Sequence, residues 1–121
     1  MVLDTNILIA YLNGEEQVVG TLQQWRLEQR ALVISAVTFV ELLALPTLTQ
    51  AEINVIKRFL RTLLCIPLDE RLAEEAARLV RTFRLRVPDA VIAATALACD
   101  MPLVSRDRAF RRVEELRLVE V

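Results

Sequence analysis

The sequence predicts an α/β protein in which helices cover both sides of a parallel sheet. Short apolar runs alternate with longer segments of helical periodicity, few turns are tight enough for hairpins, and no internal repeat is present. The 121 residues fit a single domain, residues 1–121, and can bury a hydrophobic core without disulfides. We therefore expect helices, rather than hairpin turns, to join successive strands.

The first strand is predicted at residues 1–3, where an apolar run leads directly into Asp4-Thr5-Asn6 and a helix. Gly14 ends that helix, and a second, amphipathic helix follows. Its inner face consists of Val18, Leu22 and Trp25.

A second strand is predicted at residues 32–34, followed by Ser35, which can cap a helix over residues 36–45. Pro46 ends this helix, since the residue before a proline disfavours helical geometry. Thr49 and Glu52 have the spacing of a capping box, which predicts a further helix.

Residues 64–66 are predicted as the third strand, and Asp69 starts the next helix. The inner face of that helix consists of Leu72, Ala76, Leu79, Val80 and Phe83. Pro88 and Asp89 then begin an alanine-rich helix over residues 90–99. A fourth strand at 103–104, a helical piece at 108–116 and an edge strand at 118–121 complete the chain.

The composition limits the possible functions. Hydrophobic residues make up 55% of the chain, above the globular average, so we expect an apolar surface patch and a protein partner. The net charge of −1 and the 5% aromatic content argue against a generally basic nucleic-acid binder or a base-stacking sheet. Lys57 is the only lysine, and although arginine suits phosphate contacts, an arginine-rich proteome is the simpler explanation.

The chain contains no histidine, which removes the commonest general base and transition-metal ligand. Cys65 and Cys99 lack the spacing of a zinc site or a disulfide framework. No apolar leader precedes the first strand, and Glu41 and Pro46 interrupt the long apolar stretch 31–48. We therefore expect a cytoplasmic protein without a membrane span.

Glu41 is the most informative acid. It is the only ionisable residue between Arg30 and Glu52 and lies among apolar neighbours, so it is expected to be buried in its helix. A buried acid without a partner is rare and tends to be functional. The alternatives are a helix face that meets water or a salt bridge to an arginine of another segment.

Asp4, Asp89 and Asp107 each have a structural alternative, because an aspartate at the start of a helix is a favourable N-cap. Their joint pattern favours a site. Asp4 and Asp107 follow short strands, Asp89 begins a helix, and Glu41 lies about two turns into the helix after the second strand. Such positions meet at one edge of a parallel sheet.

Four carboxylates in one crevice would raise one another's pKa unless cations were present. Oxygen ligands without histidine or cysteine suit Mg²⁺ or Mn²⁺, and metal-activated water is sufficient for phosphodiester hydrolysis. Asn6 and Ser105 could orient the carboxylates or a water molecule. Four arginines flank the acids and could bind phosphate, although solvated helix ends are the simpler explanation: Arg84, Arg86, Arg106 and Arg108.

Taken together, these segments resemble PIN-domain ribonucleases, and most of all the VapC toxins of type II toxin–antitoxin pairs. The matching motifs are Leu3-Asp4-Thr5-Asn6-Ile7-Leu8, residues 35–42 with Glu41, Pro88-Asp89-Ala90-Val91-Ile92-Ala93-Ala94, and Leu103-Val104-Ser105-Arg106-Asp107 with Phe110. Two departures are present. Ser105 stands where the family usually has threonine, and the glycine common after the Glu-Leu pair is replaced by Ala44-Leu45-Pro46.

The resemblance implies a three-layer α/β/α fold around a mostly parallel sheet of four to five short strands. It implies a Mg²⁺- or Mn²⁺-dependent endoribonuclease, a homodimer, and an antitoxin that covers the acidic pocket. The family's acids correspond to Asp4, Glu41, Asp89 and Asp107. Asp4, Asp89 and Asp107 would hold the metal, and Glu41 would bind it or position the attacking water.

Two other classes remain open. A PIN-like module could bind RNA or protein without cutting it. A phosphatase or phosphotransferase of the haloacid-dehalogenase type would require a second aspartate two residues after Asp4, where Asn6 stands, and no glycine-rich phosphate loop is present.

Overall fold

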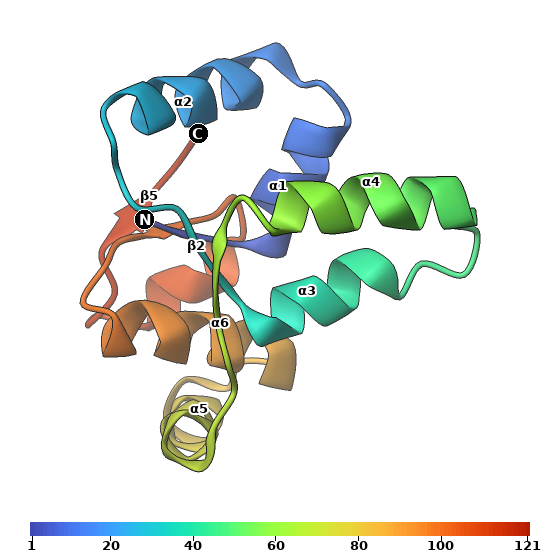
Figure 1. The fold of residues 1–121 in the computed structure, drawn as a ribbon. Coiled ribbons are helices and arrows are strands. Elements are labelled where there is room, and N and C mark those ends of the chain that lie inside the picture. The colour runs from blue at the N-terminus through green and yellow to red at the C-terminus, as the bar shows by residue number, and fades with distance from the viewer.

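A single five-stranded sheet organises the computed structural model, which describes residues 1–121 (Figure 1). The strands are β1 (Val2–Leu3), β2 (Val33–Ser35), β3 (Leu64–Ile66), β4 (Leu103–Val104) and β5 (Leu118–Val119). Their order is β3-β2-β1-β4-β5, and every neighbouring pair is parallel. The predicted parallel α/β sheet is therefore confirmed, as is the edge position of the last strand.

Six α-helices and one 3-10 helix connect the strands. They are α1 (Thr5–Leu12), α2 (Glu16–Leu27), α3 (Ala36–Leu43), α4 (Gln50–Leu60), α5 (Glu70–Phe83), α6 (Val87–Ala98) and η1 (Arg108–Arg112). The predicted caps are confirmed: Ser35 accepts from the amide of Val37, and Thr49 and Glu52 form a reciprocal capping box. Asp69 caps α5 by accepting from the amide of Leu72.

Several predicted boundaries are wrong: the helix expected at 90–99 is Val87–Ala98, the last strand ends at Val119, and two helical segments end early. The helix expected to reach residue 45 ends at Leu43, because the chain leaves helical geometry in the residues that lead to Pro46. The helical piece expected over 108–116 is only the short 3-10 helix η1. A segment this short gains few hydrogen bonds, so the burial of Phe110 rather than helix propensity holds it in place.

Successive strand residues pack into two different cores. Val2, Val33 and Leu103 belong to one buried cluster together with residues of α5, α6 and the segment around η1. Their neighbours Leu3, Ile34 and Val104 belong to a second cluster with residues of α1, α2, α3 and α4. Because side chains alternate across a strand, both faces of the sheet are covered and the protein has three layers, α/β/α.

The strand order reverses at β1, which lies between β2 and β4. The chain goes from β1 to β2 and β3 on one side, then crosses through α5 and α6 to β4 and β5 on the other. In open α/β sheets a crevice forms beyond the carboxyl ends of the strands at such a reversal. Asp4 directly follows β1, and Ser105 directly follows β4, so both lie at this position.

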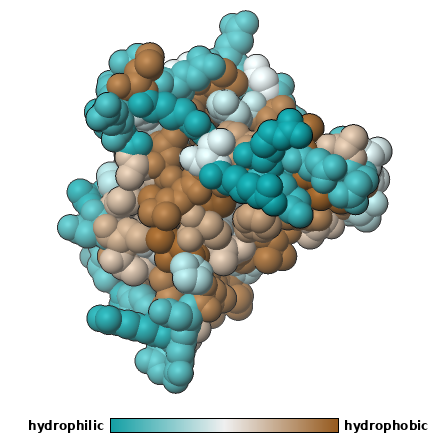
Figure 2. Space-filling view, in the orientation of Figure 1, coloured by the Kyte–Doolittle hydropathy of each residue, from teal (hydrophilic) through white to brown (hydrophobic).

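The surface is partly apolar, as the composition predicts. Figure 2 shows hydrophobic side chains gathered in the middle of one face, where Figure 1 draws the yellow-green edge strand β3 in front. Leu64 of β3 is 58% exposed, and Leu68 and Val40 are exposed as well. None of the helices combines the length and the apolar character that crossing a bilayer requires.

Candidate active site

Asp4 lies at the centre of the reversal point and is buried, with 5% of its surface exposed. Its backbone amide donates to the carbonyl oxygen of Val104 at 3.0 Å, which fixes the end of β1 beside the end of β4. Its Oδ1 accepts from the amide of Thr5 at 2.7 Å, and its Oδ2 accepts from the hydroxyl of Ser105 at 2.6 Å. Asp4 therefore caps α1 with one oxygen and binds Ser105 with the other.

Ser105 connects two of the predicted acids. Its hydroxyl donates to Asp4 and accepts from the backbone amide of Asp107 at 2.9 Å. Asp107 in turn caps η1, since its Oδ1 accepts from the amide of Ala109 at 2.9 Å. The predicted role of Ser105 in orienting a carboxylate has a direct geometric basis in these contacts.

Asp89 lies in the first turn of α6, but it is not the cap that the sequence allowed. Arg86 occupies the N-cap position, and no side chain caps this helix. Pro88 stands inside the first turn, so Asp89 falls one position beyond it and its side chain turns inwards. The residue is buried, and an ion pair joins its Oδ2 to the Nε of Arg86 at 3.5 Å.

The prediction that Glu41 is buried in an apolar helix is wrong. Glu41 is exposed because it shares the outer face of α3 with Val40, whereas Thr38 and Leu42 face inwards. Its carboxylate nevertheless points toward the site: Oε1 accepts a hydrogen bond of 2.7 Å from the hydroxyl of Thr5, the residue after Asp4. The salt bridge to an arginine that the sequence left open is absent.

Thr5 and Thr38 are functional candidates that the sequence reasoning missed. Their hydroxyl oxygens are 3.0 Å apart, and both residues are buried. Because Thr5 has one hydroxyl hydrogen and gives it to Glu41, Thr5 must accept from Thr38. The missed signal was the spacing of Thr38 and Glu41, since side chains three residues apart are neighbours on a helix.

The acids influence one another, which shows that they share one region. Burial raises the pKa of Asp4 to about 6, and the charges of Asp89 and Asp107 add to this while hydrogen bonds from Ser105 and the Thr5 amide oppose it. Burial also raises the pKa of Asp89; Arg86 opposes the rise, and the charges of Asp107 and Glu41 contribute to it. The structure therefore brings all four predicted acids to the same edge of the sheet.

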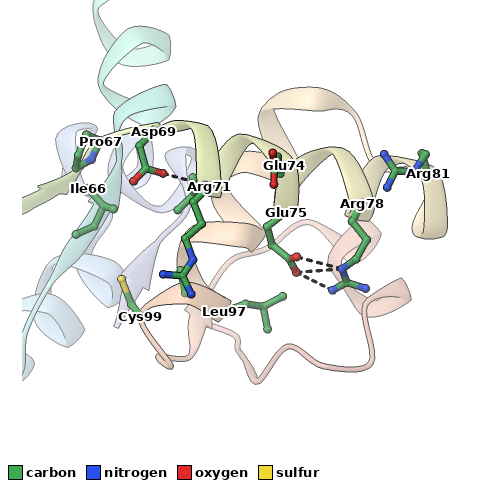
Figure 3. Close-up of a pocket in the computed structure, with 12 residues that line it drawn as sticks. Ile66, Pro67, Asp69, Arg71, Glu74, Glu75, Arg78, Arg81, Leu97 and Cys99 are labelled. Carbon is green, nitrogen blue, oxygen red and sulfur yellow. Dashed lines mark hydrogen bonds and ion pairs between the residues drawn. The ribbon is translucent and has the colours of Figure 1, made fainter.

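A separate hollow lies beside α5. The α5 groove, an open depression of about 970 Å³, is lined by residues of α5, the end of β3 and the end of α6 (Figure 3). None of the four predicted acids lines it. Two of its three acids have partners: Glu75 pairs with Arg78, and Asp69 caps α5. The α5 groove is therefore separate from the predicted site.

Comparison with protein-family models matches residues 1–116 to the PIN domain. The chain belongs to the PIN domain family. The match covers the strands β1 to β4 and every predicted site residue, so the resemblance inferred from the sequence motifs is confirmed. A search of curated protein sequences gives no match.

Solved structures similar to this PIN domain are toxin–antitoxin proteins. One is a toxin–antitoxin complex from Klebsiella pneumoniae, with 26% identity, a TM-score of 0.83, and coverage of 98% of this chain and 94% of that one. Another is FitAcB from Neisseria gonorrhoeae, with 27% identity, a TM-score of 0.76, and coverage of 97% and 94%. VapBC2 from Rickettsia felis, bound to a promoter DNA fragment, shares the fold at 20% identity and a TM-score of 0.86, with coverage of 99% and 97%.

The donor atoms of this PIN domain fit a hard divalent cation. They are carboxylate, hydroxyl and amide oxygens, with no histidine in the chain. Asn6 adds an independent sign, because its Oδ1 is buried without a hydrogen-bond partner. As the side chains stand, no three acids are grouped tightly enough to enclose an ion. The metal site therefore stays a prediction.

Proposed function

We propose that this PIN domain is a Mg²⁺- or Mn²⁺-dependent endoribonuclease and the toxin of a type II toxin–antitoxin pair. The observation that carries the proposal is the meeting of four acids from separate elements at one sheet edge, with the charges of Asp89 and Asp107 acting on buried Asp4. Such an arrangement is unfavourable unless a cation compensates it. A divalent metal ion is the cation that this donor set suits best.

Asp4, Asp89 and Asp107 would hold the metal, which supplies acidification of a water molecule and stabilisation of the leaving oxygen. Ser105 keeps the Oδ2 of Asp4 turned toward Asp107 through the two hydrogen bonds of its hydroxyl. The buried Oδ1 of Asn6 is free to accept from a water molecule at the same edge. These contacts orient the carboxylates before any ligand arrives.

Glu41 would act on the solvent side of the site. Its Oε1 is held by Thr5, which Thr38 orients in turn, and the residue is otherwise exposed. One carboxylate oxygen is thus fixed beside Asp4, while the other is free to accept a hydrogen bond from the attacking water. We propose this positioning role for Glu41, with the alternative that it binds the metal directly.

The partner proposal rests on the similar structures and the surface. Relatives with 26% and 27% identity are toxin–antitoxin proteins, and this chain exposes apolar side chains on β3, α3 and the segment after β3. We propose an antitoxin that binds this protein and covers the acidic site, together with a homodimer of the toxin in the cytoplasm.

RNA cleavage with and without metal tests the proposed activity. The purified protein should cut an unstructured, end-labelled RNA in the presence of Mg²⁺ or Mn²⁺, and EDTA should abolish cleavage. Calorimetry should detect Mn²⁺ binding in the wild type and greatly weakened binding in Asp89→Asn. Absence of both Mn²⁺ binding and cleavage would instead indicate a binding module that does not cut RNA.

Inducible expression in a bacterial host tests the toxin role. Wild-type protein should arrest growth, and co-expression of a small DNA-binding protein encoded by the neighbouring reading frame should restore it. Cleavage in vitro without growth arrest would support the nuclease activity and contradict the toxin role.

A further inference from the structure

Arg86 is the one basic side chain within ion-pair distance of any of the four site acids. Its Nε lies 3.5 Å from the Oδ2 of Asp89, and no other arginine pairs with Asp4, Glu41, Asp89 or Asp107. The guanidinium approaches from the solvent side, since the side chain of Arg86 is 81% exposed and that of Asp89 is 12% exposed. A positive charge therefore lies at the mouth of the proposed metal site.

The other arginines near the site are differently placed. Arg106 is held by two hydrogen bonds to Glu15 and one to the carbonyl oxygen of Val121, so it is directed away from the acids. Arg108 forms no ion pair, and Arg111 pairs with Glu120 near the chain end. Of the four arginines that flank the acids in sequence, only Arg86 contacts a site carboxylate.

The contact between Arg86 and Asp89 is easily exchanged. An ion pair of 3.5 Å with an exposed guanidinium is weak, because water screens it and the long side chain loses freedom when it is held. A divalent cation on Asp89 carries twice the charge and repels the guanidinium. Arg86 can move outwards on its flexible side chain without disturbing the fold, since its backbone alone forms the N-cap of α6.

We propose that Arg86 neutralises Asp89 until a divalent cation binds, and then contacts a substrate phosphate at the mouth of the site. This inference rests on the proposed function and adds the residue that binds the RNA backbone. A guanidinium suits this role because its planar donors match two phosphate oxygens. The same side chain therefore opposes metal binding and favours RNA binding.

Calorimetric titration with Mn²⁺ alone tests the first half of the inference. Arg86→Gln should bind Mn²⁺ about threefold to tenfold more tightly than the wild type, because a competing positive charge is removed. Arg86→Lys keeps the charge and should bind Mn²⁺ like the wild type. Unchanged or weaker Mn²⁺ binding by Arg86→Gln overturns the inference.

Arg117→Gln is the matched control. Arg117 is an exposed arginine that pairs with Asp100 at 3.2 Å. Asp100 precedes β4 and Arg117 precedes β5, so this pair lies beyond the amino ends of the strands, whereas the site acids lie beyond the carboxyl ends. The variant makes the same change in net charge and removes a comparable ion pair. If it tightens Mn²⁺ binding as much as Arg86→Gln does, the effect reflects net charge, and the inference is overturned.

The RNA half is tested at saturating Mn²⁺ with an end-labelled single-stranded RNA. Arg86→Gln should raise the KM for cleavage several-fold. It should also reduce the slope of log KM against log salt concentration by about 0.7, the value for one lost phosphate contact on a single strand. Arg86→Lys should raise KM less, and Arg117→Gln should leave both quantities unchanged. An unchanged KM and salt dependence in Arg86→Gln overturns this half.

Failure of the inference can be distinguished from failure of the proposed function. A wild type that binds Mn²⁺ and cuts RNA, with Arg86→Gln behaving identically, overturns the role of Arg86 alone. A wild type and an Arg86→Gln variant that both fail to bind Mn²⁺ and to cut RNA overturn the proposed function and the inference together.

Discussion

Two regions of this protein are rich in acids, and their acids are held in opposite ways. In the α5 groove, Glu75 is half-buried and pairs with Arg78, which also pairs with Glu115. At the sheet edge, Asp4 is buried, and its partners are a serine hydroxyl and a backbone amide rather than an arginine. The groove acid Glu75 is thus compensated by an arginine, whereas Asp4 is not.

The pKa values show what this difference means. Hydrogen bonds and charge from Arg78 lower the pKa of Glu75, whereas burial raises the pKa of Asp4 to about 6. Arg78 therefore favours the ionised form of Glu75 without any ligand, whereas burial makes the ionised forms of Asp4 and Asp89 less favourable, a cost that a bound cation would offset. Buried carboxylates with raised pKa values, rather than the number of acids, distinguish the candidate site.

The largest expected effect comes from removing the central charge. Asp4→Asn should lower metal-dependent RNA cleavage by at least about 100-fold, because an asparagine is a poor ligand for a hard cation. The fold should persist, since the asparagine oxygen can still cap α1 and its amide nitrogen can donate to the Ser105 hydroxyl. Cleavage rates and circular dichroism measure the two properties.

Glu75→Gln is the counterpart in the α5 groove and should leave cleavage unchanged. Equal losses of cleavage in Asp4→Asn and Glu75→Gln would show that the sheet edge is no more important for activity than the α5 groove. Full activity in Asp4→Asn would refute the assignment of the site.

Removing the serine hydroxyl should have the next largest effect. Ser105→Ala takes away the hydrogen bonds to Asp4 and to the Asp107 amide, so Mn²⁺ affinity should fall by about 10- to 100-fold. Ser105→Thr keeps the hydroxyl and should retain most of the affinity. Calorimetry on the three proteins gives the result, and equal loss in both variants would point to packing rather than to the hydroxyl.

The pH dependence of stability should also separate the regions. Folding raises the pKa of Asp4 from its ordinary value of 3.8 to about 6, so the folded protein binds this proton more tightly than the unfolded chain does. The stabilisation is full below the unfolded pKa and is lost as pH rises through the folded pKa. Lowering the pH from about 7 to about 5 should thus increase the contribution of Asp4 to the unfolding free energy of the metal-free protein by about 1 kcal/mol.

Urea denaturation of the wild type and Asp4→Asn at both pH values measures this contribution as a difference. Asp89, whose pKa is also raised, is present in both proteins, so the difference contains only Asp4 and its interaction with Asp89. Identical pH dependence in the two proteins would show that Asp4 is not held in the way the structure indicates.

The smallest effect is expected in the α5 groove. Arg78→Gln removes ion pairs to Glu75 and Glu115 that water screens, so the free energy of unfolding should fall only slightly. Metal binding and RNA cleavage should not change. A large loss of cleavage would mean that the groove contributes to function despite its compensated charges.

The sequence predicted most of the fold because its signals are local. The apolar run before Asp4, the capping box at Thr49 and the inward face of α5 each need only neighbouring residues to form. The errors arose where local signals were weak: α3 ends before Pro46, and η1 is a single short helix. Neither has enough local hydrogen bonding to fix its length without tertiary contacts.

The four acids could be named from the sequence, but their environments could not. Glu41 lies among apolar neighbours along the chain and still faces outwards, because helix packing decides which side of α3 is covered. Thr38 gave no signal by itself, since its contact to Thr5 joins α3 to the start of α1.

The sequence by itself determined the alternation of strands and helices, the caps, and the identity of the acids, because each depends on residues close together in the chain. The tertiary structure decided the strand order and therefore which strands end side by side. By placing β4 beside β1, it brought Ser105 to Asp4, one hundred and one residues earlier, and left Arg86 as the one arginine that contacts the acids. Contacts of that sequence separation depend on how both sheet faces are buried, which no local pattern specifies.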